Sequence, residues 1–159
     1  MPPPLLIDLD RVDTQRVLLS REQIYEKYLP HRFEFMLLDG VCHVDVSART
    51  IVAFADIRPD AWWVRGHVPG RPLLPGVLML EMAGQLAAIG AMLMIGNEGF
   101  IGYGGVNECK FRDTVVPPTR LYLLVLGTDI RPRRIVSQTQ GVADGRLIFE
   151  ATVTGMTLR

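Results

Sequence analysis

A long apolar run at residues 77–96, VLMLEMAGQLAAIGAMLMIG, constrains the fold more than any other part of the chain. Its length approaches that of a membrane span, but Glu81 and Gln85 lie one helical turn apart near its start. Soluble cores also contain helices that are apolar on every side. We therefore expect a buried core helix. We expect it to begin at Pro75 and Gly76, because a proline in the first helical turn loses no hydrogen bond.

Most of the remaining chain has the composition and turn signals of β-strands. The two runs that precede the long helix are expected to form a hairpin, and the last two runs meet at Asp144-Gly145, a strong turn signal. A short helix is expected to begin at Ser20, which forms a capping box with Gln23, and to end at Pro30. The expected strands are 36–46, 50–57, 100–106, 110–116, 120–127, 133–143 and 146–158.

These elements predict an α+β fold in which a sheet of five or more mostly antiparallel strands wraps one long helix. Small residues along the helix follow a three-and-four spacing that lets other backbone come close. They are Ala83, Gly84, Ala87, Ala88 and Ala91. With 159 residues and 48% hydrophobic content, the chain is long enough for one domain with a sizeable core and too short for two.

Charge and cysteine content exclude some classes of function. The 17 basic and 17 acidic residues cancel, so a global positive field for nucleic acid is absent, and a charged partner must meet a local patch. Cys42 and Cys109 are too few for a disulfide framework and lack metal-ligand spacing, so we expect reduced thiols that pack in the fold. Because no basic region followed by a long apolar stretch opens the chain, we expect no secretory signal and a cytoplasmic location.

The segment GHVPGRPLLPGV places His67 just ahead of the long helix. Pro69, Pro72 and Pro75 restrict its backbone, so we expect a rigid loop that holds the imidazole in place. Gly76 stands at the expected start of the helix, where N–H groups lack intrahelical partners. Since glycine has no side chain, a substrate oxygen can approach that amide, as an oxyanion site requires.

Glu81 is the residue that most needs explanation, because an isolated ionised carboxylate is costly to bury. It therefore needs a partner, a protonated state or a catalytic role. Gln85 follows one turn later and can hold one of the Glu81 oxygens. The spacing alone fits a catalytic group built from a histidine, a backbone donor and a carboxyl, and it fits equally a structural glutamate paired with an arginine.

The remaining polar motifs have simpler interpretations. His31 follows the first helix and is expected to tie its loop to backbone carbonyls, and His43 is expected to be an ordinary strand residue. The run GYGG at 102–105 predicts a glycine-rich strand that a backbone or ligand can approach, because no helix signal follows it. The sequence contains no nucleophile elbow, phosphate-binding loop, zinc-protease motif or Cys-x-x-Cys pair.

Two motifs resemble one known family, the 3-hydroxyacyl-[acyl carrier protein] dehydratases of bacterial fatty acid synthesis. LPHRFEFMLLDGV resembles that family's LPHRYPFLLVDRV, and GHVPGRPLLPGVLMLEMAGQ is similar to its GHFPGxPxxPGVLxxEAxAQ. The resemblance extends from about Ser20 to Thr154, so we expect an N-terminal extension at 1–19 and a single domain at 20–159. It implies the hot-dog fold, an antiparallel β-sheet wrapped around a long central α-helix.

The resemblance also implies a mechanism. His67 is the implied general base that removes the C2 proton of a 3-hydroxyacyl thioester, and Glu81 is the implied acid, with a raised pKa, that protonates the departing hydroxyl. The Gly76 amide is implied to bind the thioester carbonyl, and no metal or organic cofactor is needed. The family further implies a homodimer that combines His67 of one subunit with Glu81 of the other, and larger assemblies of three dimers.

The implied partner is an acyl carrier protein, which is acidic and would need a local cationic patch. Candidate docking residues are Arg71, Lys110, Arg112, Arg131, Arg133 and Arg134. Two other enzymatic readings stay open: a hot-dog thioesterase, and a hydratase that acts on coenzyme A thioesters. A non-catalytic acyl-binding subunit is a third, but the intact set of His67, Gly76 and Glu81 argues against it.

Overall fold

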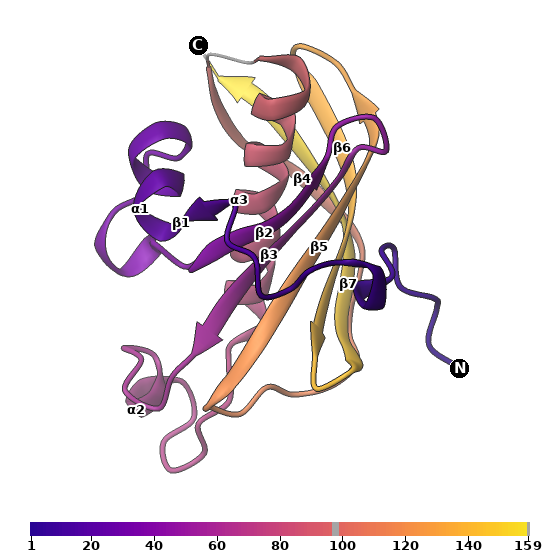
Figure 1. Ribbon diagram of the computed structural model, residues 1–159. Coiled ribbons are helices and arrows are strands. Elements are labelled where there is room, and N and C mark those ends of the chain that lie inside the picture. Colours follow the sequence, from indigo (N-terminus) through magenta and orange to yellow (C-terminus); the bar gives the residue numbers. More distant parts are fainter. Residues whose placement is uncertain (97–98, 159) are drawn as a thin grey trace.

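The computed structural model describes residues 1–96 and 99–158, and in them an antiparallel seven-stranded sheet wraps one long helix (Figure 1). The strand order is β1-β2-β3-β5-β6-β7-β4. The strands are β1 (Leu19–Ser20), β2 (Gly40–Asp45), β3 (Thr50–Ile57), β4 (Phe100–Phe111), β5 (Thr119–Ile130), β6 (Arg134–Ala143) and β7 (Arg146–Leu158). The helices are α1 (Arg21–Gln23), α2 (Val64–His67) and α3 (Gly76–Ile95). The predicted α+β class and the wrapped helix are therefore confirmed.

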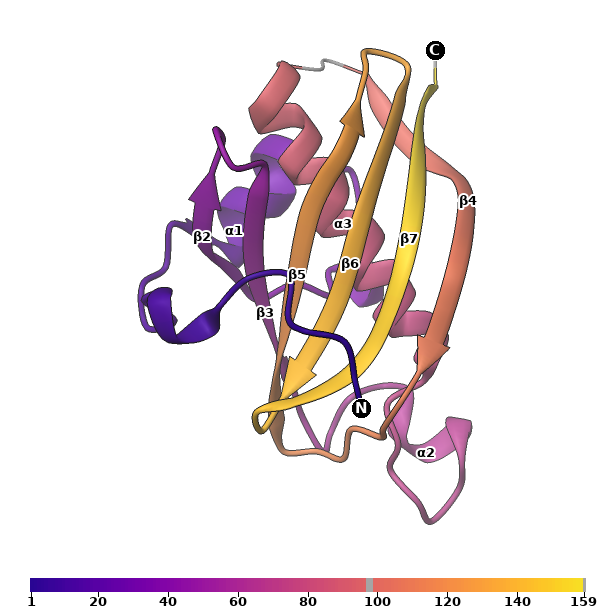
Figure 2. The same cartoon turned by 90° about the vertical axis from the view of Figure 1, so that its right-hand side faces the viewer.

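The long helix α3 begins where the sequence predicted. Pro75 is its N-cap, and the helix ends at Ile95; Gly96 is the C-cap, with a left-handed φ of 62° and an N–H that bonds the carbonyl of Met92. In the described part of the chain, α3 alone has the length and hydropathy of a membrane span, yet 61% of its most apolar window is buried inside the molecule. It lies on one face of the sheet (Figure 2), which makes it the core helix that the sequence predicted.

The small residues of α3 do permit close approach. A Cβ atom added to Gly84 would lie 2.6 Å from the ring of Tyr103 on β4, a separation that real Cβ atoms do not tolerate. Ala83, Ala87 and Ala88 are buried around this point. The edge strand β4 therefore packs directly against the helix backbone.

The predicted hairpins are present, but β4 differs from the prediction. β2 pairs with β3, and β6 turns into β7 at Asp144 and Gly145, both with positive φ. The two expected strands at 100–106 and 110–116 are instead one strand that ends at Phe111. A bulge between Asn107 and Lys110 absorbs the polar stretch, and a second lies between Tyr103 and Gly105; a bulge bends a strand and lets its pairing continue.

The first helix forms as predicted but is irregular. Ser20 accepts a hydrogen bond from the Gln23 amide, and the Gln23 side chain accepts one from the Ser20 amide, so the capping box is complete. α1 then widens into a π-helical turn at Ile24–Tyr28, and Leu29 closes it before Pro30. A one-turn 3-10 helix at Phe33–Phe35 follows and leads into β2.

Residues 1–18 cross the face of the sheet that is opposite α3 (Figure 2). A one-turn 3-10 helix at Leu9–Arg11 lies within this segment. Ile7 and Leu9 pack against a second apolar cluster that contains Phe54 and Leu124. Gln140 on β6 accepts a hydrogen bond from the Leu6 amide and donates one to the Pro4 carbonyl. The expected N-terminal extension is therefore packed on the sheet.

Candidate active site

Glu81 lies in the second turn of α3 and faces a pocket between α3, β4 and β7. The pocket has a volume of about 300 Å³, and most of its wall is apolar, with Phe35, Ile101 and Val153 among the lining residues. The Glu81 side chain is 25% exposed. A half-buried carboxylate thus faces a cavity whose other walls suit a hydrocarbon chain.

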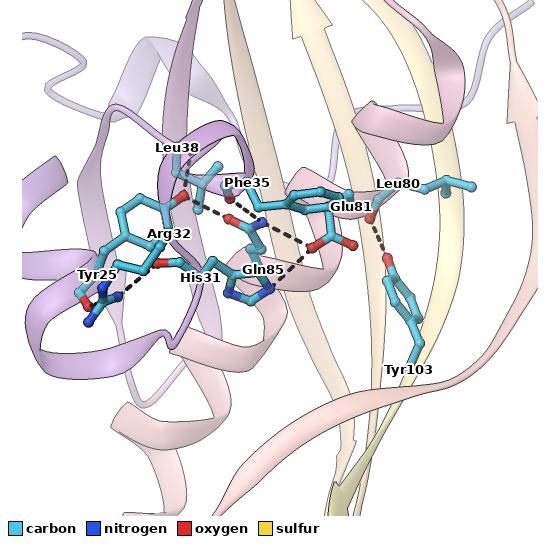
Figure 3. Close-up of polar contacts among 9 residues, drawn as sticks. All are labelled: Tyr25, His31, Arg32, Phe35, Leu38, Leu80, Glu81, Gln85 and Tyr103. Atoms are coloured by element: carbon cyan, nitrogen blue, oxygen red, sulfur yellow. Dashed lines mark hydrogen bonds and ion pairs between the residues drawn. The ribbon is translucent and has the colours of Figure 1, made fainter.

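Two side chains hold the same oxygen of Glu81 (Figure 3). The amide nitrogen of Gln85 donates to Oε1 of Glu81 at 3.0 Å, as the i+4 spacing predicted. Nε2 of His31 lies 3.2 Å from the same Oε1 atom. Figure 3 shows the second oxygen, Oε2, directed away from both donors.

The Gln85 side chain is itself fixed by hydrogen bonds. Its amide nitrogen also donates to the carbonyl of Phe35 at 3.0 Å, and its carbonyl oxygen accepts from the Tyr25 hydroxyl at 2.7 Å. Tyr25 in turn accepts from the Leu38 amide at 2.8 Å. Burial raises the pKa of the Tyr25 phenol, so Tyr25 keeps its proton and donates it to Gln85. Every hydrogen bond in this network then donates in one direction, from Leu38 through Tyr25 and Gln85 to Glu81.

The pKa of Glu81 is lower than its ordinary value, which corrects the raised pKa expected from the sequence. Burial alone raises this pKa, but the hydrogen bonds from His31 and Gln85 oppose burial and outweigh it. Donors that bond the ionised carboxylate favour that form over the neutral acid. In the isolated chain the Glu81 carboxyl is therefore an acceptor at neutral pH.

The loop role expected of His31 belongs instead to Arg32. One guanidinium nitrogen of Arg32 donates to the carbonyls of Tyr25, Leu29 and His31, at 2.7, 3.3 and 2.8 Å. A cation at the end of the first helix satisfies carbonyls that lack intrahelical partners. His31 is thereby free to turn its imidazole toward Glu81, a contact that sequence reasoning missed.

His67 is the last residue of α2, so the expected rigid loop contains a one-turn helix. Its amide donates to the carbonyl of Trp63 at 2.9 Å. The imidazole is exposed and lines a second pocket of about 360 Å³ together with Trp62, Trp63 and Leu78. Glu81 does not line this pocket, so the chain by itself does not bring the two predicted catalytic residues into one cavity.

Gly76 is the first residue of α3, as predicted, and has a packing role. A Cβ atom added here would lie 2.7 Å from the ring of Phe111 at the end of β4. Pro75 precedes it as N-cap without a capping side chain. In the described part of the chain, the Gly76 amide has no acceptor, and it marks the positive end of the helix dipole.

Tyr103, in the glycine-rich stretch of β4, is a further pocket residue that sequence reasoning missed. Its hydroxyl donates to the carbonyl of Leu80, one residue before Glu81. Burial, and secondarily the charge of Glu81, raises the pKa of this phenol. The prediction that GYGG lies on a strand close to other backbone is confirmed, because this part of β4 packs against α3 at Gly84. Gly102 and Tyr103 also line the pocket.

The six candidate docking residues are all exposed but do not lie together. Residues 131–134 connect β5 to β6 at the end of the sheet opposite α2 (Figures 1 and 2). Arg131 and Arg134 pair there with Asp129. Arg71, Lys110 and Arg112 lie at the α2 end, and Arg112 pairs with Glu150. The sequence alone could not show that these residues lie at opposite ends of the molecule, because their positions depend on the lengths and directions of the strands that carry them.

The other candidate residues have structural surroundings. Cys42 is buried and Cys109 partly buried, both as free thiols, so packing in the fold is confirmed for Cys42. His43 lies on β2, where Nε2 is 3.5 Å from the Thr50 hydroxyl. Over residues 1–96 and 99–158, no three His, Cys, Asp or Glu side chains gather closely enough to hold a metal ion.

Comparison with known proteins agrees with this fold. Residues 29–152 match the family model of the FabA-like domain. The dehydratase heterocomplex ApeI:P from Xenorhabdus doucetiae superposes with a TM-score of 0.68 at 15% identity, covering 84% of this chain and 90% of that chain. The class of protein is thus a FabA-like protein with the hot-dog fold.

Curated relatives define the family more closely. The chain is 32% identical to 3-hydroxyacyl-[acyl-carrier-protein] dehydratase FabZ of Clostridium botulinum strain Loch Maree / Type A3, over 79% of this chain and 88% of that protein. It is 36% identical to the protein of the same name from Alkaliphilus metalliredigens strain QYMF, over 74% and 79%. The chain belongs to the 3-hydroxyacyl-[acyl carrier protein] dehydratases, which confirms the family and the enzyme class that the motifs predicted.

Proposed function

We propose that this protein dehydrates 3-hydroxyacyl groups on acyl carrier protein to trans-2-enoyl groups, as a cytoplasmic step of fatty acid synthesis. The observation that carries the proposal is the Glu81 carboxyl, held by one oxygen at the wall of an apolar pocket. A pocket for hydrocarbon with a carboxyl group at its edge, beside the ionisable side chains of His31 and Tyr103, suits acid–base chemistry on an acyl thioester. Membership of the dehydratase family supports the same reaction.

The proposed reaction assigns one step to each site residue. His67 removes a proton from C2, and the Gly76 amide binds the thioester carbonyl on which negative charge develops. Glu81 gives its proton to the 3-hydroxyl, the C3–O bond breaks, water leaves, and the C2=C3 double bond forms. Electrons and atoms balance without a metal or organic cofactor.

Glu81 must carry a proton to act as the acid, although the donors of His31 and Gln85 lower its pKa. An acyl chain in the apolar pocket displaces water from the carboxyl, and loss of solvation favours its neutral form. Substrate binding therefore raises the pKa of Glu81 toward the range in which it can donate.

The site is proposed to form between two copies of the chain, so that His67 of one subunit meets Glu81 of the other. Separation of the two residues into different pockets supports this arrangement. The edge strand β4 also supports it, because Tyr103, Val106 and Phe111 expose large apolar side chains along an unpaired edge. A second copy would cover that edge, and three such dimers would form the larger assembly.

The carrier protein is proposed to dock at the α2 end of the molecule. Arg71 and Lys110 are exposed near the His67 pocket, whereas Arg131, Arg133 and Arg134 lie at the other end of the sheet. An acidic carrier gains most from cations beside the entrance its acyl group must use. Charge reversal at Arg71 or Lys110 should raise KM for carrier-linked substrate, while reversal at Arg133 should not.

The test follows the absorbance of the enoyl thioester after 3-hydroxyacyl carrier protein is added to wild type, His67→Ala and Glu81→Gln. We expect product from wild type alone, because general acid and base groups each contribute about 10²–10⁴-fold. Co-expression of the two variants should restore about a quarter of wild-type sites if the site spans two subunits, since half of random dimers are mixed and each has one intact site. Full activity of either variant alone, or release of free thiol, would refute the assignment.

A further inference from the structure

The two oxygens of Glu81 have different surroundings. Oε1 receives both the Gln85 amide and the His31 imidazole, at 3.0 and 3.2 Å. Within the described residues, Oε2 has no hydrogen-bond partner, and Figure 3 shows it pointing away from both donors. A neutral carboxyl group has one carbonyl oxygen and one hydroxyl oxygen. An oxygen that already accepts two hydrogen bonds is the better carbonyl, so the proton belongs on the other one.

The network leaves the Gln85 amide only one orientation. The Tyr25 hydroxyl accepts from the Leu38 amide and gives its single proton to the carbonyl oxygen of Gln85. The amide nitrogen of Gln85 must then face Phe35 and Glu81. A reversed amide would place its oxygen against the acceptors of Phe35 and Glu81, and its nitrogen, also a donor, against the hydroxyl proton of Tyr25.

The surroundings of His31 also select one form of its ring. Nδ1 is buried and has no partner within the described residues, while Nε2 faces Glu81. A proton on Nδ1 would leave a buried donor unsatisfied, at a cost of about 1–3 kcal/mol. The neutral form with its proton on Nε2 avoids this cost and gives Oε1 a donor.

We propose that His31 is a positioning residue for Glu81: its Nε2–H, with the Gln85 amide, holds Oε1 as an acceptor and directs the catalytic proton to Oε2. The proposal rests on the proposed function, which makes Glu81 the acid. It assigns a task to the histidine of the LPHRFEF segment, which α1 and its π-helical turn deliver to the pocket. Without His31, the carboxyl could rotate and present either oxygen to the substrate.

Few other charged or titratable groups face Glu81. Tyr103 approaches from β4 and is engaged with the Leu80 carbonyl. Tyr25 acts only through Gln85, the polar neighbour on α3 itself. Arg32 directs its guanidinium to backbone carbonyls. His31 is therefore the neighbour whose removal should change the Glu81 titration most.

The test compares His31→Phe, which keeps a ring without a donor, with His31→Gln, whose amide nitrogen can replace Nε2. The carboxyl carbon of Glu81 is followed by NMR against pH in ¹³C-glutamate-labelled protein and assigned with Glu81→Gln. Because donors to a carboxylate lower its pKa, we expect the midpoint to rise by about one pH unit in His31→Phe and to stay near wild type in His31→Gln. His43→Phe, at a histidine that does not line the pocket, is the matched control.

Turnover provides the second readout. We expect kcat to fall about tenfold in His31→Phe with little change in KM, and to recover largely in His31→Gln, because the orientation of the acid is lost and restored. If His31→Phe does not fold, His31→Asn replaces it, because its shorter amide does not reach Oε1. An unchanged Glu81 midpoint overturns the proposal. If the Glu81 midpoint shifts in His31→Phe as expected but wild type forms no enoyl product, the proposed function is refuted and the His31 contact stands.

Discussion

The Glu81 pocket and the His67 turn differ in how the chain holds its proposed catalytic side chain. Glu81 is half-buried and tied through Gln85 and His31 to segments far apart in the sequence. His67 is exposed at the end of a one-turn helix and, within the part of the chain that the structure describes, forms hydrogen bonds only through its backbone amide. The Glu81 side chain is thus positioned by contacts within one subunit, whereas the position of the His67 side chain depends on what packs over it.

This difference has a physical origin. A carboxylate in an apolar wall must have its donors built in, because an unpaired buried charge is costly. A histidine at a solvated surface carries no such cost and needs only a fixed backbone, which Pro69 and Pro75 supply. Glu81 and His67 are both proposed to take part in the reaction, but only Glu81 is expected to contribute strongly to the stability of the folded protein.

The largest effect on turnover is expected from matched truncations of the two residues. Glu81→Ala and His67→Ala should each lower kcat by at least about 100-fold. Glu81→Ala should also lower the free energy of unfolding by about 1–3 kcal/mol, because the donors of His31 and Gln85 lose their acceptor, whereas His67→Ala should change it by less than about 0.5 kcal/mol. Urea denaturation beside kinetics measures both, and equal losses of stability would contradict the comparison.

The stability effect of Glu81 should depend on pH. Its folded pKa lies below its ordinary value of about 4.5, so its contribution is present above that unfolded value and is lost as pH falls through the folded pKa. The stability difference between wild type and Glu81→Gln should therefore shrink as the pH is lowered from 6 toward about 3. A difference that widens with acid would mean that Glu81 has a raised pKa.

Gly76→Ala is expected to lower kcat/KM by about 10²-fold, because a methyl group blocks the amide proposed to bind the carbonyl. It also meets the Phe111 ring at 2.7 Å, so lost packing must be separated from lost chemistry. The double variant Gly76→Ala, Phe111→Leu provides that separation. Stability should recover in it while activity stays low; recovery of both would leave Gly76 with a packing role only.

Tyr25→Phe should have a smaller effect on turnover, about tenfold, since it acts on Glu81 only through Gln85. Removal of the hydroxyl leaves the buried Leu38 amide without an acceptor and frees the Gln85 amide to reverse. Thermal melting should show a loss of about 1–3 kcal/mol. Tyr28→Phe is the control, because Tyr28 lies on the same turn while the bond to Gln85 belongs to Tyr25; equal losses in both would remove Tyr25 from the network.

The sequence predicted the parts of this molecule that local signals determine. The start of α3 at Pro75, the capping box at Ser20 and the bond between Gln85 and Glu81 follow from spacing within a turn or two. His31 was assigned to the wrong task, because its contact with Glu81 spans 50 residues and arises from the path of a loop. The neighbouring Arg32 bonds the backbone carbonyls in its place. A loop has no regular side-chain period, so the sequence does not show which of two adjacent residues faces the pocket.

The predicted direction of the Glu81 pKa shift was wrong for a related reason. Burial was visible in the apolar run, and burial alone raises the pKa of a carboxyl. The second donor, His31, was not visible, and together with Gln85 it reverses the direction. A sequence can show that a carboxylate needs partners, but the number of donors it finds is a property of tertiary structure.

Removal of residues 1–16 should have the smallest effect on turnover. This segment lies on the face of the sheet opposite α3, and neither the Glu81 pocket nor the His67 pocket contains any of its residues. We expect kcat within about twofold of wild type, because both halves of the site keep their supports. The free energy of unfolding should fall by about 2–4 kcal/mol, since Ile7, Leu9 and Val12 no longer cover the cluster around Phe54. Leu9→Ala should show a smaller loss of the same kind, and a large loss of kcat in the truncated protein would mean that the outer face of the sheet supports the site.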